Sequence, residues 1–229
     1  MPQSLEFRTP DGIVSCTVRR AFNAGYTGRD QSVVRAHVEE LAELGVAPPG
    51  VVPTVFSVPT TMNLQADEIE VAHAETSGEI EWALLHRGEG LSPLLTIASD
   101  HSDRRLEAHD VAASKQITPN VLAREAFVLD ELGDAVDDCV MRASVSVDGV
   151  DFSVQQEGTV AELIAPTEWL RRLEDLGRLA PDTLVMGGTL PMKQPDAQFA
   201  PWWRVELEAP SGAVISHTYR VTQMPPSIV

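Results

Sequence analysis

The sequence has 229 residues and a formal net charge of −17, from 17 Lys and Arg against 34 Asp and Glu. This length allows a buried core in one large domain or two small ones. The acidic balance disfavours binding of nucleic acid, whose affinity for proteins depends on cationic side chains. No apolar run reaches the roughly 18 residues of a membrane span, and the N-terminus lacks a secretory signal pattern.

Two cysteines, Cys16 and Cys139, lie far apart in the sequence. Such sparse cysteines are typical of reduced thiols rather than of a disulfide framework, and they exclude zinc ribbons and fingers by number alone. With the absence of a signal or a span, this predicts a cytoplasmic protein. We therefore expect no nucleic acid or membrane partner.

The first half of the chain is rich in predicted strands. Residues 12–22 alternate weakly and predict one or two strands, while residues 32–45 carry an apolar stripe at helical spacing. Residues 47–59 contain too many prolines for a helix and predict extended chain. Residues 64–100 predict strands separated by short turns.

The second half continues this pattern. Residues 141–156 alternate around Asp148-Gly149, which predicts a β-hairpin. Residues 167–177 predict a short amphipathic helix with Thr167 as its N-cap. Residues 202–221 predict another hairpin, whereas residues 112–127 leave extended and helical chain open. The absence of regular strand–helix alternation excludes a doubly wound parallel sheet.

Two identical Glu-Ile-Glu tripeptides contain Glu68 and Glu70, and Glu79 and Glu81. Residues two apart in a strand share a face, so either pair has the geometry to bind one divalent cation. The upstream pair has further acids beside it and is interpreted as a solvated edge. The downstream pair runs directly into the apolar segment WALL, and Asp100 ends another apolar run nineteen residues later.

A carboxylate buried at the end of a strand needs a partner, because an unpaired buried charge is costly. Oxygen-only ligands suit hard cations such as Mg²⁺, Mn²⁺ or Ca²⁺. Glu79, Glu81 and Asp100 are therefore predicted to form one metal site. The alternative is that these acids only keep an acidic protein soluble.

The order of these segments resembles the fumarylacetoacetate hydrolase superfamily, and more closely a shorter, DUF2848-like branch of it. GEIE resembles its Glu-x-Glu strand, and SDHSDR its following segment, with Asp100 as the third ligand and Arg104 in place of its arginine. SKQITP offers Lys115 at its lysine, VDGVDFSVQQ resembles its hairpin, and LAPDTLVMGGTLPMKQ its Gly-rich segment with Thr189 at the threonine. VFSVPTT and GRDQSVVRAHVEEL resemble two upstream segments, so the similarity spans roughly residues 25 to 195.

The resemblance implies that the three carboxylates hold Mg²⁺ or Mn²⁺, with Ca²⁺ as an alternative, and that the substrate is a small 2-oxo acid. Lys115 and Arg104 would bind the substrate carboxylate, and Gly188 and Thr189 would supply neutral hydrogen bonds. His37 and Glu40 are three apart and share a helical face, so they would form a dyad that activates water.

The implied reaction is hydrolysis of a C–C bond in an acylpyruvate through a metal-stabilised enolate. A decarboxylase or isomerase on the same site is the nearest alternative, and a non-catalytic protein that retains the metal is another. The implied fold is α+β but mainly β, a mixed β-sheet roll with a few short helices, and commonly a homodimer. It forms one domain over residues 1–229, in which residues 1–50 supply strands and the dyad helix and residues 51–229 the roll.

The remaining polar residues carry no such pattern. Asp103 beside Arg104 is interpreted as half of a local surface pair, and His101 as a structural histidine or one that orients a ligand. His73, His86, His109 and His217 have no partner pattern and are predicted to lie at the surface or to be satisfied in the core.

Overall fold

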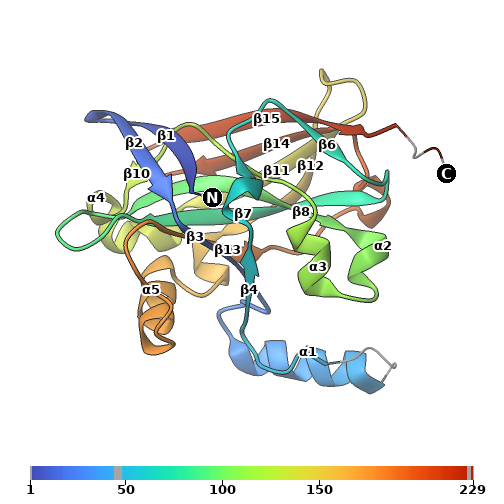
Figure 1. The fold of residues 1–229 in the computed structure, drawn as a ribbon, viewed down its shortest axis with the longest axis horizontal. Helices are drawn as coiled ribbons and strands as arrows, with labels where there is room; N and C mark the ends of the chain where they lie inside the picture. The colour runs from blue at the N-terminus through green and yellow to red at the C-terminus, as the bar shows by residue number, and fades with distance from the viewer. Residues whose placement is uncertain (1, 44–47, 226–227, 229) are drawn as a thin grey trace.

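The computed structural model describes residues 2–43, 48–225 and 228, and the side chains of these residues except 37, 40–43 and 195. Three β-sheets and a few short helices make up this part of the chain (Figure 1). The α+β, mainly β architecture with a mixed, curled sheet is confirmed.

An eight-stranded mixed sheet forms the centre, in the order β4-β3-β13-β7-β8-β9-β5, with β10 also paired to β8. β13 runs parallel to β3 and antiparallel to β7, so the sheet pairs an early strand of the chain with a late one. Its strands are β3 (Arg20–Gly25), β4 (Thr54–Val58), β5 (Asn63–Leu64), β7 (Thr76–His86), β8 (Leu94–Asp103), β9 (Asn120–Leu122), β10 (Phe127–Val128) and β13 (Thr183–Thr189).

A five-stranded sheet packs on one face of this central sheet, in the order β12-β11-β14-β15-β6. Its strands are β6 (Glu68–Val71), β11 (Val140–Ser146), β12 (Ser153–Thr159), β14 (Trp202–Glu208) and β15 (Val214–Gln223). Side chains from both sheets, such as Ile80, Trp82 and Trp203, share one hydrophobic core. Such sheet-on-sheet packing buries alternate residues of each strand.

A separate hairpin, β1 (Gln3–Thr9) and β2 (Gly12–Val18), covers part of the opposite face of the central sheet. Leu5, Phe7 and Val18 pack there against Ala83 and Leu85 of β7. β7 is therefore buried on both faces, which explains why its sequence continues as an almost unbroken apolar run.

The helices are short and lie around the sheets, with α1 on the side away from β14 and β15 (Figure 1). Of the helices in the described residues, none combines the length and the apolar character that a membrane crossing requires. They are α1 (Gln31–Glu43), α2 (Arg104–Glu107), α3 (Val111–Gln116), α4 (Leu129–Leu132) and α5 (Pro166–Asp175), with 3₁₀ turns η1 (Thr60–Met62), η2 (Gly133–Asp138), η3 (Val160–Glu162) and η4 (Pro195–Ala197).

Most predicted elements are found, with local differences. The hairpin around Asp148-Gly149 is β11–β12, and α1 matches the predicted helix, of which residues 44 and 45 lie outside the described part. Thr167 as N-cap is wrong: α5 begins at Pro166, whose fixed φ suits a first helical position. Residues 112–127, left open by the sequence, contain the end of α3, then β9 and the start of β10.

Candidate active site

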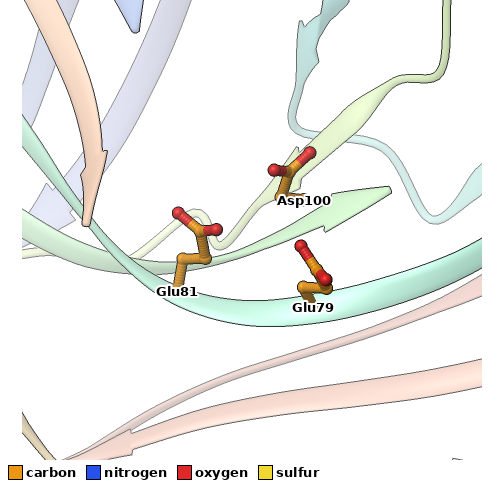
Figure 2. Close-up of side chains that lie close together, drawn as sticks. All are labelled: Glu79, Glu81 and Asp100. Carbon is orange, nitrogen blue, oxygen red and sulfur yellow. The ribbon is translucent and has the colours of Figure 1, made fainter. Parts of the chain in front are cut away.

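Three carboxylates converge on one face of the central sheet. Glu79 and Glu81 lie on β7, and the antiparallel register places Glu79 directly opposite Asp100 of β8. Figure 2 shows the three side chains directed to the same side of the two strands. One carboxylate oxygen from each lies within 4.8 Å of the others. This is the spatial grouping that the Glu-x-Glu spacing predicted.

The other Glu-Ile-Glu tripeptide lies on the edge strand β6. There Glu68 and Glu70 are exposed while Ile69 and Val71 are buried. The interpretation of this pair as a solvated edge is confirmed, and the two tripeptides differ because only β7 is buried on both faces.

Lys115 of α3 lies between two of the carboxylates. Its Nζ donates hydrogen bonds to Glu79 Oε2 at 3.0 Å, Asp100 Oδ2 at 2.5 Å and Ser102 Oγ at 3.2 Å. The ammonium therefore uses all three of its protons, and its side chain is buried. Burial opposes the charged form of Lys115, but the nearby carboxylates outweigh this effect and hold its pKa above its usual range.

Arg104, the first residue of α2, bridges two acids. Its Nη2 donates to Glu79 Oε1 at 2.8 Å, and its Nη1 to Glu107 Oε2 at 2.5 Å. Asp103 caps α2 by accepting from the amides of Arg105 and Leu106, which fixes the direction of the helix start. Arg104 thus orients Glu79 from the side opposite Lys115.

The third carboxylate, Glu81, is held by the backbone. The Gly188 amide donates a 2.8 Å hydrogen bond to Glu81 Oε2, at a bulge where the pairing of β13 with β7 shifts register. Gly188 has a φ of +88°, and a Cβ there would lie 1.9 Å from Thr27 Oγ1. Only glycine fits this position. The amide predicted to serve the substrate therefore holds a carboxylate instead.

Thr189 lies beside this bulge. Its hydroxyl donates to the Ile80 carbonyl at 2.8 Å and accepts from Gln156 Nε2 at 2.8 Å. Gln156 Oε1 in turn accepts from the Ile80 amide at 2.9 Å. Gln156 lies on β12 of the β11–β12 hairpin, and its hydrogen bonds connect Thr189 to Ile80 of β7.

The three carboxylates have different proton affinities. Burial favours the neutral form of Glu79, but the charges of Lys115 and Arg104 outweigh it and lower the pKa to about 2. Burial, followed by the charge of Asp100, raises the pKa of Glu81 well above its ordinary value. Burial also raises the pKa of Asp100, although Lys115 opposes this effect. Negative charge is thus only partly compensated.

This arrangement fits a divalent cation. Asp100 Oδ1 is buried and has no hydrogen-bond partner among the described residues. The oxygen donors suit a hard cation, and one dication together with Lys115 would balance the charge of the three carboxylates. The Glu-Glu-Asp group is therefore able to hold a metal ion.

A cavity of about 690 Å³ opens above the carboxylates. Its wall includes Glu79, Glu81, Lys115, Gly188 and Thr189, so five of the predicted site residues border one space. Arg104 is not among the lining residues, because its guanidinium is directed to Glu79 and Glu107. His37 and Glu40 belong to α1, whose residues Val33 and Val34 border the cavity. Their side chains lie outside the described part of the chain.

Three asparagines that are far apart in the sequence form hydrogen bonds beside Asp100, and the sequence analysis did not identify them. Asn120 Nδ2 donates to Asn23 Oδ1 at 3.2 Å and to Asn63 Oδ1 at 3.1 Å, and all three are buried. The Asn23 amide adjoins Asp100 and favours its charged form. No spacing in the sequence connects residues on β3, β5 and β9.

The interpretation of Asp103 needs correction. Asp103 is not at the surface: it is fully buried and bonded to His73 Nδ1. His73 therefore has a partner that its sequence context did not reveal. His101 faces away from the carboxylates and bonds Tyr219 Oη at 2.6 Å, in keeping with a structural histidine.

Comparison with known proteins places this site in a family. The family described as "Protein of unknown function (DUF2848)" matches residues 24–219. The chain belongs to the DUF2848 family. No curated protein matches this DUF2848 sequence.

Solved structures share the fold of this DUF2848 protein at low identity. The structure of Cg1458 has a TM-score of 0.65 and 15% identity, covering 98% of this chain and 100% of that one. A 2-keto-3-deoxy-D-arabinonate dehydratase, complexed with magnesium and 2,5-dioxopentanoate, has a TM-score of 0.65 and 16% identity. The match covers 94% of this chain and 78% of that one. The maleylpyruvate hydrolase of Sphingobium sp. SYK-6, in complex with manganese (II) and pyruvate, has a TM-score of 0.62 and 12% identity. The match covers 91% of this chain and 72% of that one. The fold is thus that of the fumarylacetoacetate hydrolase superfamily.

Proposed function

We propose that this DUF2848 protein is a divalent-metal-dependent enzyme that hydrolyses a C–C bond in an acylpyruvate-type 2-oxo acid. The observation that carries the proposal is the convergence of Glu79, Glu81 and Asp100, because the two glutamates border a cavity large enough for a small molecule. Two structural neighbours were solved with magnesium or manganese and an oxo compound, which supports the choice of metal and substrate class.

The three carboxylates would hold Mg²⁺ or Mn²⁺, with Ca²⁺ as an alternative. When bound, such an ion supplies a Lewis acid that stabilises negative charge developing on the keto oxygen of a 2-oxo acid. Lys115 favours the ionised forms of Glu79 and Asp100 and holds both side chains in place, because its ammonium contacts both. Arg104 fixes the second oxygen of Glu79, and the Gly188 amide fixes Glu81.

Substrate binding would fall to the residues that border the cavity next to the carboxylates. Lys115 offers positive charge to the substrate carboxylate, and the Thr189 hydroxyl a neutral contact. Arg104 acts on the substrate only through its effect on Glu79, because its own donors point to Glu79 and Glu107.

Hydrolysis also requires a base that takes a proton from water. We assign this role to His37, with Glu40 accepting from its other ring nitrogen and raising its basicity. Both residues belong to α1, and three-residue spacing puts them on one helical face. The neighbouring residues Val33 and Val34 border the cavity, which supports the assignment.

A reaction without attack by water is the second candidate, because one structural neighbour is a dehydratase. Decarboxylation or keto–enol isomerisation would use the same carboxylates and Lys115 but not the base. A protein that binds metal without turnover is a third alternative. We further propose that the protein is cytoplasmic. We also propose that it forms a homodimer, and light scattering of the purified protein would test this oligomeric state.

The decisive experiment measures turnover of a panel of acylpyruvates and oxaloacetate with Mg²⁺ or Mn²⁺, and with EDTA as the control. Metal-dependent release of pyruvate from an acylpyruvate supports hydrolysis, and His37→Ala should abolish it. Full hydrolase activity of His37→Ala would refute the dyad. Metal binding without turnover of any member of the panel would refute the enzyme proposal.

A further inference from the structure

The cavity extends well beyond the carboxylates, and its remote part is apolar. α1, β3 and β4 form one side of it, and the segment after β13 forms another. The uncharged residues that border it include Gly25, Tyr26, Val34, Phe56, Val111 and Leu190. A volume of about 690 Å³ exceeds what a pyruvate-sized group needs, so it leaves room for a substantial second part of a bound molecule.

The described residues of this remote part offer no cation to a second anionic group. Lys115 is the one cation among the described residues that border the cavity, and its three donors are taken by Glu79, Asp100 and Ser102. The other charged residues along the wall are acidic, namely Glu107 and Glu162.

Arg29, which follows the lining residue Gly28, is engaged elsewhere. Arg29 donates to both carboxylate oxygens of Asp137 and to the Leu163 carbonyl at 2.8 Å. A second carboxylate in the remote part would therefore lose its hydration and gain no ion pair, which is unfavourable.

The apolar wall is held in a defined shape. The Phe56 ring packs so closely on β3 that a Cβ at Gly25 would lie 3.0 Å from Phe56 Cε2. Tyr26 has a φ of 58°, a left-handed conformation that is uncommon for a residue other than glycine. Gln31 Nε2 stabilises it by donating to the carbonyls of Tyr26 at 3.0 Å and Gly28 at 2.8 Å. Backbone strain of this kind concentrates at binding sites.

α3 connects the two parts of the cavity. Val111 and Lys115 are four residues apart and therefore share one face of this helix. Lys115 reaches the carboxylates, while Val111 borders the remote part. The same helix face thus presents a cation to one end of the bound molecule and an apolar side chain to the other.

We propose that the substrate is a monocarboxylic 2-oxo acid with an uncharged, apolar tail, alkyl or aryl, that occupies this remote part, and that dicarboxylic analogues are rejected. This inference rests on the proposed function, since the carboxylates and Lys115 must receive the 2-oxo acid end. It assigns specificity to Phe56, Val34 and Val111, residues outside the carboxylate cluster.

The test uses calorimetric titration of Mn²⁺-loaded protein with two ligands of equal chain length, 2-oxooctanoate and 2-oxooctanedioate, and with pyruvate as a reference. We expect 2-oxooctanoate to bind at least about tenfold more tightly than the dicarboxylate, as for any buried charge without a partner. Both affinities should fall when Mn²⁺ is removed by EDTA.

A variant should reverse this preference. Val111→Lys places an ammonium in the remote part and should favour the dicarboxylate, whereas Val150→Lys, at a position that is 76% exposed and outside the cavity, should keep the original ratio. Val34→Lys provides a second placement of the cation, on α1, if Val111→Lys does not fold.

The outcomes separate the two proposals. If the dicarboxylate binds the unmodified protein as tightly as 2-oxooctanoate, the apolar-tail inference is overturned while metal-dependent recognition of 2-oxo acids stands. The apolar-tail inference is also overturned if pyruvate binds and neither long ligand does. If no ligand binds, pyruvate included, the proposed function fails and the inference fails with it.

Discussion

The Gly188 amide donates a 2.8 Å hydrogen bond to the Glu81 carboxylate, across the bulge between β13 and β7. Glu81 is buried, and this burial, followed by repulsion from Asp100, raises its pKa although the Gly188 amide opposes the effect. The bulge therefore does two things: it turns a backbone donor toward the carboxylate and brings Gly188 against Thr27.

Gly188→Ala should consequently disturb both the fold and the site. Gly188 and Gly212 have nearly equal φ values, +88° and +85°, but a Cβ at Gly212 meets nothing within 4 Å. Gly212→Ala should cost about 1 kcal/mol from backbone strain alone, and Gly188→Ala clearly more, because Thr27 must move. Chemical denaturation of both variants measures the difference. Equal losses of stability would show that the close approach to Thr27 is unimportant.

Removal of one predicted metal ligand should weaken metal binding. Glu81→Gln or Asp100→Asn keeps the size of the side chain but deletes a charge, and should raise the Kd for Mn²⁺ at least about tenfold, a loss of about 1.4 kcal/mol. Glu68→Gln, in the exposed copy of the same tripeptide, is the matched control and should bind Mn²⁺ normally. Titration calorimetry decides, and similar affinities of all three variants would place the metal elsewhere.

Lys115→Met should destabilise the metal-free protein. The substitution leaves Asp100 buried without a cation, a change that typically costs about 3–5 kcal/mol, while Glu79 keeps its ion pair with Arg104. Saturating Mn²⁺ should recover part of this loss, because a bound dication replaces the missing charge. The gain in Tm on metal addition should therefore be larger for Lys115→Met than for the unmodified protein.

Lys193→Met is the control for that experiment. Lys193 is 48% exposed and lies 3.6 Å from Glu157, so its loss should change stability by less than about 1 kcal/mol. Metal-free Lys115→Met could instead prove as stable as Lys193→Met. That result would mean that the negative charge of the carboxylates is neutralised in another way, such as by protonation.

His101 should contribute to acid sensitivity. Burial, aided by repulsion from Arg104, lowers its pKa to about 3, from an ordinary value of 6.5. Between these values the unfolded chain binds a proton that the folded protein does not, so stability falls as the pH decreases from 6.5 toward 3. The slope from this group approaches about 1.4 kcal/mol per pH unit.

The comparison with His101→Gln isolates this effect, because glutamine retains a group able to bond Tyr219 and does not titrate. When the unfolding free energy of each protein is plotted against pH across this range, the two slopes should differ by up to about 1.4 kcal/mol per pH unit, which corresponds to one bound proton. Parallel curves would mean that His101 takes up a proton in the folded state as readily as in the unfolded chain.

Local patterns predicted the elements that depend on neighbours in the sequence. The alternation that ends in WALL indicated β7, and the Asp148-Gly149 turn indicated the β11–β12 hairpin. The Glu-x-Glu spacing predicted that Glu79, Glu81 and Asp100 group together, as they do on the adjacent strands β7 and β8. These features were predictable because one short segment contains most of what determines them.

Contacts between distant segments were not predictable in this way. The bulge at Gly188 and the Asn23–Asn63–Asn120 contacts depend on how strands far apart in the chain are placed. The apolar wall of the cavity likewise combines α1, β4 and the end of β13. No single segment carries a signal for any of them.

The parallel pairing of β13 with β3 has a consequence for biosynthesis. The partner of Arg20 is Thr183, and the amide that anchors Glu81 follows five residues later. A ribosome therefore releases Glu79, Glu81 and Asp100 long before the strand that closes around them. During this interval the nascent chain carries three acids next to an incomplete sheet, and such non-local closure is intrinsically slow. An early encounter with a dication would bring these acids together before β13 is synthesised.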